Sequence, residues 1–151
     1  MAINQLVIFA LDGEEYGVDV TTVNGILRSS KFKIQTVPGL PSAIEGIINL
    51  RGRVNYIFNL RKKFNLTLNE YPEDSKFVML NLNGTIAGCI VDEVTDIVKF
   101  NEEDIQPAPE FVSQNNGYLK GIVKIDDRMV IFLDPEKLLA IEEYNLLEVA
   151  D

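Results

Sequence analysis

Apolar and polar residues alternate with a period of two over several short stretches of the chain, which is the pattern of half-buried β-strands. The first apolar stretch, Leu6–Leu11, ends at Asp12-Gly13, a dipeptide that favours a two-residue hairpin turn. The return strand is expected from Glu15 to about Val20. The chain is therefore predicted to begin with a β-hairpin.

The stretch that follows is less regular. Apolar residues between Val20 and Leu27 have spacings that fit either one helical turn or an irregular strand, and periodicity does not separate the two. Phe32–Val37 predicts another strand, which Pro38 ends. Residues 42–45 are expected to form a helical turn.

The clearest pattern runs from Gly46 to Phe64 and predicts a strand, a tight turn, a second strand and the start of a helix. The turn falls at Arg51-Gly52, where glycine supplies the positive φ that a hairpin needs. Alternating residues from Arg53 to Phe58 form the second strand, and Asn59 can cap the helix. The basic residues Arg61–Lys63 are expected to leave a basic face on this helix.

Both parts of this pattern occur twice. A shift of 75 residues places Gly121 on Gly46 without a gap, and a shift of 71 residues places Gly88 on Gly17. The change of shift predicts four additional residues in the second copy, in a surface loop between Pro109 and Gly121. An internal repeat of this kind constrains the architecture more strongly than any other feature of the sequence.

The repeat predicts an all-β fold within a single domain of residues 1–151. The two copies span about residues 5–65 and 76–140, and neither is large enough to bury much apolar surface alone. Small units of this kind usually close into barrels. We therefore expect two SH3-like, five-stranded β-barrels packed through an apolar face, with short helices and a C-terminal helix over about residues 135–149.

Composition narrows the range of partners. The net charge of −9 disfavours nucleic acid and anionic membrane surfaces, because both attract basic proteins. Neither a signal peptide nor an apolar stretch of membrane-spanning length is visible, so a soluble, cytoplasmic protein is expected. The single cysteine, Cys89, lies in the apolar run Ile86–Val91 and is expected to be buried and unreactive.

Candidate catalytic chemistry is sparse. The chain has no histidine, which removes the commonest general base and metal ligand. The adjacent carboxylates Asp92-Glu93 and Asp126-Asp127 would point to opposite faces of a strand or lie in a turn. Neither a phosphate-binding glycine loop nor zinc-ligand spacing is present. We predict no catalytic residue, no metal site and no cofactor, and therefore no enzyme.

Several ordered motifs resemble the CheW family of bacterial chemotaxis adaptors, from about Leu6 to Leu147. The most specific are Gly-Ile-Ile-Asn-Leu-Arg-Gly at 46–52 and Asn-Leu-Arg-Lys-Lys-Phe at 59–64. Supporting motifs lie at residues 15–19, 91–92, 106–111 and 127–128. The two-barrel fold of that family agrees with the repeat.

The resemblance implies an adaptor between membrane chemoreceptors and the histidine kinase CheA. Such adaptors hold the cytoplasmic hairpin tip of a receptor in a groove between the barrels, and the matching positions are Val23, Gly46 and Arg51. The second barrel would dock on the kinase's regulatory domain. Phe77–Leu82 or Ile86–Val91 are candidate docking strands, although the kinase-contact residues are not identified by the sequence. The protein would be cytoplasmic and recruited to membrane-associated receptor arrays.

The chain departs from the family pattern at three positions. Gly25 stands where a glutamate commonly contributes to receptor binding, Tyr56 replaces a frequent proline, and Asn59 replaces a usual aspartate. Two other functions stay open at this point. One is an adaptor of the same fold in a kinase pathway other than flagellar chemotaxis, and the other is a hydrolase that uses surface carboxylates.

Overall fold

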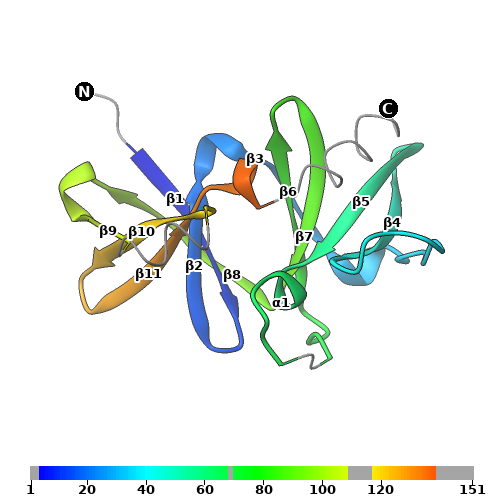
Figure 1. Ribbon diagram of the computed structural model, residues 1–151, viewed down its shortest axis with the longest axis horizontal. Helices are drawn as coiled ribbons and strands as arrows, with labels where there is room; N and C mark the ends of the chain where they lie inside the picture. Colours follow the sequence, from blue (N-terminus) through cyan, green and yellow to red (C-terminus); the bar gives the residue numbers. More distant parts are fainter. Residues whose placement is uncertain (1–3, 68–69, 109–116, 139–151) are drawn as a thin grey trace.

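The computed structural model describes residues 4–67, 70–108 and 117–138, whose strands form two sheets (Figure 1). One sheet has the order β8-β1-β2-β11-β10-β9, and the other has the order β3-β6-β7-β5-β4. We call them the six-stranded and the five-stranded barrel. The strands are β1 (Asn4–Leu11), β2 (Glu14–Asp19), β3 (Val23–Arg28), β4 (Ile44–Leu50), β5 (Arg53–Asn59), β6 (Lys76–Leu82), β7 (Thr85–Val91), β8 (Glu93–Phe100), β9 (Ile105–Pro107), β10 (Leu119–Ile125) and β11 (Arg128–Leu133).

Short helical segments join the strands. The four-residue helix α1 (Leu60–Lys63) begins at Asn59, whose side chain accepts a hydrogen bond from the backbone of Lys62, as predicted. The 3₁₀ helices are η1 (Val20–Thr22), η2 (Ser29–Lys31), η3 (Glu102–Asp104) and η4 (Pro135–Lys137). Of the expected C-terminal helix, the described residues contain only η4 and Leu138, and the remainder lies outside them.

The predicted internal repeat is confirmed by the elements. A shift of 75 residues carries the bounds of β4 onto those of β10 and the first residue of β5 onto the first residue of β11. Register shifts recur as well, at Asn24 in β3 and at the equivalent Thr95 in β8. The predicted insertion falls mainly on residues 109–116, which lie outside the described residues.

Each barrel, however, takes strands from both copies of the repeat. The hairpin β1–β2 pairs with β8 and β11 of the second copy, while β6–β7 pairs with β3 and β5 of the first. This corrects the expectation that residues 5–65 and 76–140 each form their own barrel. The switch between sheets comes directly after each hairpin: η1, capped by Asp19, joins β2 to β3, and Asp92 alone joins β7 to β8.

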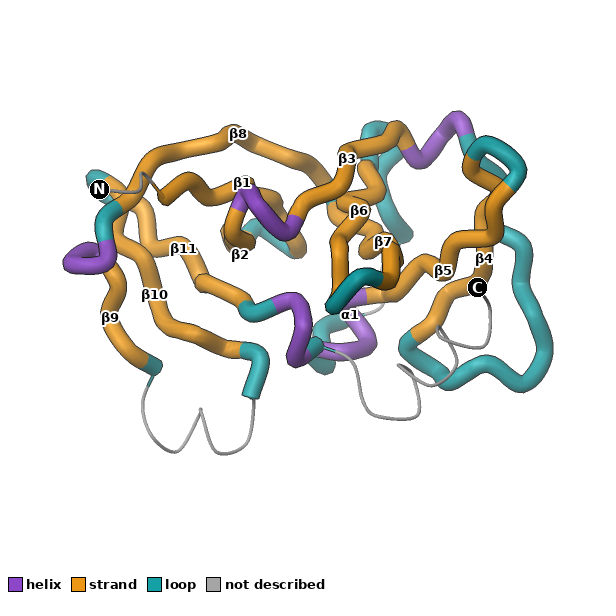
Figure 2. Tube along the Cα trace, turned by 90° about the horizontal axis from the view of Figure 1, so that it is seen from above, coloured by secondary structure: helices purple, strands orange, loops and turns teal. Residues whose placement is uncertain are grey.

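This exchange places the two repeated hairpins in the middle of the molecule. Seen from above, β9, β10 and β11 lie at one end and β4 and β5 at the other, with β1, β2, β6 and β7 between them (Figure 2). Strands β6 and β7 are each paired on both sides within the five-stranded barrel. Neither Phe77–Leu82 nor Ile86–Val91 therefore offers a free edge for docking, which corrects that expectation.

The central position of β1 explains why its sequence is apolar on both faces. Leu6 and Ile8 are buried inside the six-stranded barrel, whereas Val7, Phe9 and Leu11 face the other way. There they join residues of β6 and β7 in one core cluster shared by the two barrels. A third cluster, around Ile48, Ile57 and Phe77, fills the five-stranded barrel. Burial of this continuous apolar surface holds the barrels together.

The structure differs from two predictions for the loops, at residues 32–37 and 42–45, and it decides between helix and strand for residues 20–27. Residues 32–37 do not form a regular strand, because only Gln35 is paired, through an isolated bridge to Ile47. Residues 42–43 form a simple turn instead of a helical one, and β4 begins at Ile44. Between Val20 and Leu27 the chain forms both of the expected structures, one after the other: first a 3₁₀ turn, η1, and then the strand β3.

Close backbone approach explains two of the repeated glycines. A Cβ at Gly46 would overlap the carbonyl oxygen of Gln35 and lie 2.7 Å from Ile34 Cγ2. A Cβ at the equivalent Gly121 would overlap the carbonyl oxygen of Gln106. Glycine is therefore required where the chain at Gln35 pairs with β4 and where β9 pairs with β10.

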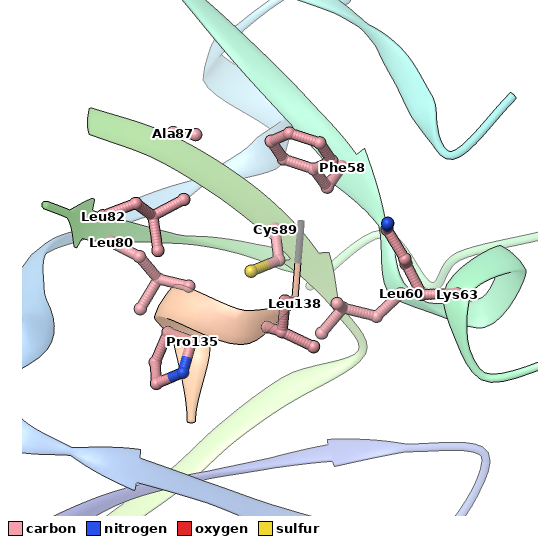
Figure 3. A pocket seen from close by; sticks show the side chains of 9 residues that line it. All are labelled: Phe58, Leu60, Lys63, Leu80, Leu82, Ala87, Cys89, Pro135 and Leu138. Atoms are coloured by element: carbon pink, nitrogen blue, oxygen red, sulfur yellow. The ribbon is translucent and has the colours of Figure 1, made fainter. Parts of the chain in front are cut away.

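The single cysteine lies at the junction of the barrels. Cys89 on β7 points into a small apolar cavity of about 10 Å³, which Pro135 and Leu138 line from the other side (Figure 3). Burial raises the pKa of its thiol to about 12, so the thiolate is scarce at neutral pH. The prediction of a buried Cys89 is confirmed.

One charged residue is buried at the same junction. Arg61 of α1 is 2% exposed, which corrects the expected basic face, and its guanidinium lies 4.1 Å from the ring centre of Tyr71. It pairs with Asp92 at 2.5 Å, where the chain crosses between barrels, and with Asp12 at 3.2 Å, in the β1–β2 turn. Asp92 also accepts a hydrogen bond from the backbone of Asp12. This cluster connects the five-stranded barrel to the six-stranded one.

We expect Gly46→Ala and Gly121→Ala each to lower the free energy of unfolding by about 2 kcal/mol, because the added methyl group meets backbone that has little room to move. Gly25→Ala is the control, since a Cβ there meets nothing within 4 Å. Urea denaturation measures all three. Equal stability of the three variants would contradict the steric role of Gly46 and Gly121.

We expect Arg61→Met to destabilise the protein by about 2 kcal/mol, because it removes a buried guanidinium and leaves the partly exposed Asp12 and Asp92 without their cation. Lys62→Met is the matched control. Its half-exposed side chain makes only a 3.6 Å pair with Glu45, so a change below about 0.5 kcal/mol is expected. Thermal melts of the two variants at one pH provide the comparison.

Candidate functional site

The turn between β4 and β5 carries an arginine in an unusual backbone conformation. Arg51 has φ +53° and Gly52 has φ +83°, and the side chain of Asn49 accepts a hydrogen bond from the backbone of Gly52 at 2.9 Å. The equivalent first positions of the three other hairpin turns hold residues that tolerate positive φ well: Asp12, Asn83 and Asp126. Arginine is the exception among them. A residue that local structure does not favour indicates a functional requirement.

Arg51 lines an open groove of about 760 Å³ at one edge of the five-stranded barrel. All of its lining residues belong to this barrel, so it is not the groove between the two barrels that the family resemblance implies. The turns that contain Arg51 and Gly84 both lie at the upper edge of this barrel in Figure 1. We call this site the arginine groove and define it by the residues that matter for its chemistry: Asn24, Arg51, Arg53, Val54, Gly84 and Ile86. Its walls combine two cations with exposed apolar surface, since Val54 is 55% exposed.

Of the three residues matched to receptor binding, only Arg51 lines this groove. Val23 is half-buried at the start of β3 and packs against the shared core, although its neighbour Asn24 reaches the groove. Gly46 is buried within β4, where it leaves room for the backbone of Gln35, which pairs with Ile47. The part that Val23 and Gly46 play in receptor binding stays a prediction.

Arg53, Val54 and Ile86 line the site but were not predicted from the sequence. Alternation along β5 suggested that Val54 shares the buried face of Phe58, yet Val54 is exposed while Asn55 and Ile57 are buried. The repeat held a usable signal. Met129, the equivalent of Val54, is 54% exposed, so the same surface position carries an exposed apolar side chain in both barrels.

A cluster of charges occupies the equivalent surface of the six-stranded barrel. The Arg128 guanidinium makes two hydrogen bonds to Glu15, at 2.9 and 2.7 Å, and two to Asp96, at 2.9 and 2.8 Å. These bonds hold the pKa of both carboxyl groups below its usual value and raise the pKa of Arg128. Because Glu15 is on β2 and Asp96 on β8, the cluster joins strands on either side of β1.

Three pockets lined by described residues lack the chemistry of a carboxylate hydrolase. Such an enzyme needs converging Asp or Glu side chains. The apolar cavity, the arginine groove and the neighbouring pocket beside Lys31 and Lys33 have no Asp or Glu among their lining residues. A group of three or more His, Cys, Asp or Glu side chains able to hold a metal ion is also absent from the described residues.

Membrane-spanning helices are likewise absent from residues 4–67, 70–108 and 117–138. None of the helical segments there is long and apolar enough to cross a bilayer.

The arrangement of elements matches proteins of known family. The family described as CheW-like domain matches residues 5–143 of the chain. The chemotaxis protein CheW of Klebsiella aerogenes is 37% identical over 145 residues, covering 95% of this chain and 86% of that protein. The chemotaxis protein CheW of Helicobacter pylori is 33% identical, covering 89% of this chain and 81% of that protein.

A solved structure shows the same fold. The crystal structure of the scaffolding protein TtCheW from Thermoanaerobacter tengcongensis aligns with a TM-score of 0.85 and 31% identity. The alignment covers 93% of this chain and 94% of that protein, so both barrels and their arrangement are shared.

We expect Arg128→Gln to reduce the stability of the protein at pH 7 by up to about 1 kcal/mol, because Glu15 and Asp96 lose their bidentate partner. Both carboxyl groups have lowered pKa values in the folded protein. Their stabilisation is therefore present above the unfolded-state pKa and is lost as the pH falls below about 4. Urea denaturation at pH 7 and pH 3 should show the difference from wild type narrowing in acid.

Arg53→Gln is the matched control for this experiment. Arg53 is the repeat equivalent of Arg128 but has no ion pair with any carboxylate in the described part of the chain. Its stability difference from wild type should be small at both pH values. A difference for Arg128→Gln that is independent of pH would show that its charge pairs do not stabilise the fold.

Proposed function

Because the chain belongs to the CheW family of chemotaxis scaffold proteins, we propose that it couples membrane chemoreceptors to the histidine kinase CheA. As a family member it is an adaptor and not an enzyme. The observation that carries the proposal is the match over nearly the whole chain, which includes both barrels and the turn at Arg51.

On the receptor side, we assign the binding of the cytoplasmic hairpin tip to the surface around Arg51. An amphipathic helix suits such a surface, because apolar contacts supply affinity while a guanidinium fixes orientation. Two structural features support the assignment: Arg51 occupies a backbone position that favours Asn, Asp or Gly, and the groove beside it exposes Val54. Gly46 contributes by letting the backbone at Gln35 pair closely with β4, and Val23 by packing the start of β3 against the core.

On the kinase side, the partner is the regulatory domain of CheA, and the contact residues stay unassigned. Strands β6 and β7 are interior, so docking must use another surface of the molecule. The expected location is the cytoplasm, at receptor arrays beside the membrane, where both partners meet. Recruitment would then depend on protein contacts and not on membrane insertion.

We expect Arg51→Asn to weaken receptor-tip binding about tenfold or more, because an arginine at the centre of an interface typically contributes over 1 kcal/mol. The fold should be as stable as wild type or more so, because asparagine adopts φ +53° more readily than arginine. Binding to the regulatory domain of CheA should be unchanged. The variant is therefore measured by thermal melt, receptor-tip binding and kinase binding.

Asp126→Asn is the control, because it makes the same kind of change in the equivalent turn of the six-stranded barrel. It should leave all three measurements unchanged. Unaltered receptor binding by Arg51→Asn would remove Arg51 from the site. A wild-type protein that binds neither a receptor tip nor the kinase domain would overturn the adaptor proposal itself.

A further inference from the structure

The internal repeat allows the arginine groove to be compared with the charge cluster on the other barrel. Arg53 and Arg128 are equivalent, each being the first residue after a hairpin turn. The two positions that hold Asp96 and Glu15 in the six-stranded barrel hold Gly25 and Ile86 in the five-stranded one. The backbone is arranged in the same way at both places, because the register shift at Asn24 falls on the register shift at Thr95 when the two copies of the repeat are aligned.

The two equivalent arginines therefore differ in whether they have partners. The guanidinium of Arg128 makes four hydrogen bonds to two carboxylates of its own chain. Both of those carboxylates are missing around Arg53, and no other carboxylate in the described part of the chain pairs with it. The space is also open, since a Cβ at Gly25 would meet nothing within 4 Å.

The surroundings of Arg53 reinforce its charge. Arg51 lies in the same groove, and the neighbouring pocket, which shares Arg53 and Val54 with it, is lined by Lys31 and Lys33. These four cations have no acidic residue beside them in either lining, in a chain whose net charge is −9. Such a local excess of positive charge is complementary to an acidic partner.

We propose that Arg53 binds a carboxylate of the partner, an Asp or Glu side chain on an amphipathic helix that occupies the arginine groove. This carboxylate takes the place that Glu15 and Asp96 have beside Arg128, with the bidentate geometry seen there. Apolar residues on the same face of the helix contact Val54 and Ile86. The inference rests on the proposed receptor function and adds the chemistry that the partner must present.

The test uses the full-length protein and a receptor cytoplasmic tip. Arg53→Gln should weaken binding about tenfold or more, because a hydrogen-bonded charge pair is lost, and the loss should shrink at high salt. A second variant, Gly25→Asp, supplies Arg53 with an internal carboxylate at the position equivalent to Asp96 and leaves the apolar contacts of Val54 and Ile86 intact. It should weaken binding to a similar degree while leaving the melting temperature equal or higher, which a merely structural role of Arg53 does not predict. Stronger binding by Gly25→Asp would overturn the role of Arg53.

Arg128→Gln is the matched control and should leave receptor binding unchanged. The outcomes separate the two proposals. A wild-type protein that fails to bind the tip overturns the receptor function. A wild type that binds, together with an Arg53→Gln variant and a Gly25→Asp variant that bind equally well, overturns the role of Arg53 alone. Replacing the acidic residues of the tip with their amides should abolish the difference between wild type and Arg53→Gln.

Discussion

Neither half of this chain can close a barrel with its own strands, and most of the structure follows from that constraint. Each barrel needs the hairpin of the other repeat, which enters through a parallel pair: β2 beside β11, and β7 beside β5. The equivalent glycines Gly17 and Gly88 keep these junctions tight, because a Cβ at Gly88 would lie 2.8 Å from Ile57 Cδ1. The buried pair of Arg61 with Asp92 then fixes the point where the chain crosses over. The two barrels are therefore a single cooperative unit.

Much of the fold could be predicted from local pattern. Alternation, hairpin dipeptides and the two shifts located the strands of the repeated hairpins and the cap at Asn59, because these features depend on residues close in sequence. The strand expected at residues 32–37 was wrong, and β3 was left undecided between helix and strand. Strand partnership could not be predicted, because alternation indicates which face is apolar but not which strand lies alongside. Arg61 shows the same limit. Its burial depends on Asp12 and Asp92, which approach only in the folded chain.

The candidate site shows a similar division. Arg51 could be identified from its motif, whereas its positive φ and the groove around it required coordinates. Arg53 differs from Arg128 because two positions distant in sequence, Gly25 and Ile86, do not supply carboxylates. The lack of carboxylate partners for Arg53 is therefore visible only when the two barrels are compared. The repeat gives both barrels the same backbone arrangement. Different residues at a few equivalent surface positions give the two barrels different surface chemistry. An adaptor that joins unlike partners needs such a difference.

The exchange of hairpins also sets an order for folding during synthesis. Strand β2 pairs with β11, and roughly 110 residues separate the end of one strand from the end of the other. At a translation rate of about 5–20 residues per second, the first hairpin waits about 5–20 s for its partner to be made. During that time β1 carries apolar side chains on both faces with no sheet to cover them. The nascent chain is therefore most exposed to aggregation at its N-terminal end, and a ribosome-associated chaperone would have the most to protect there.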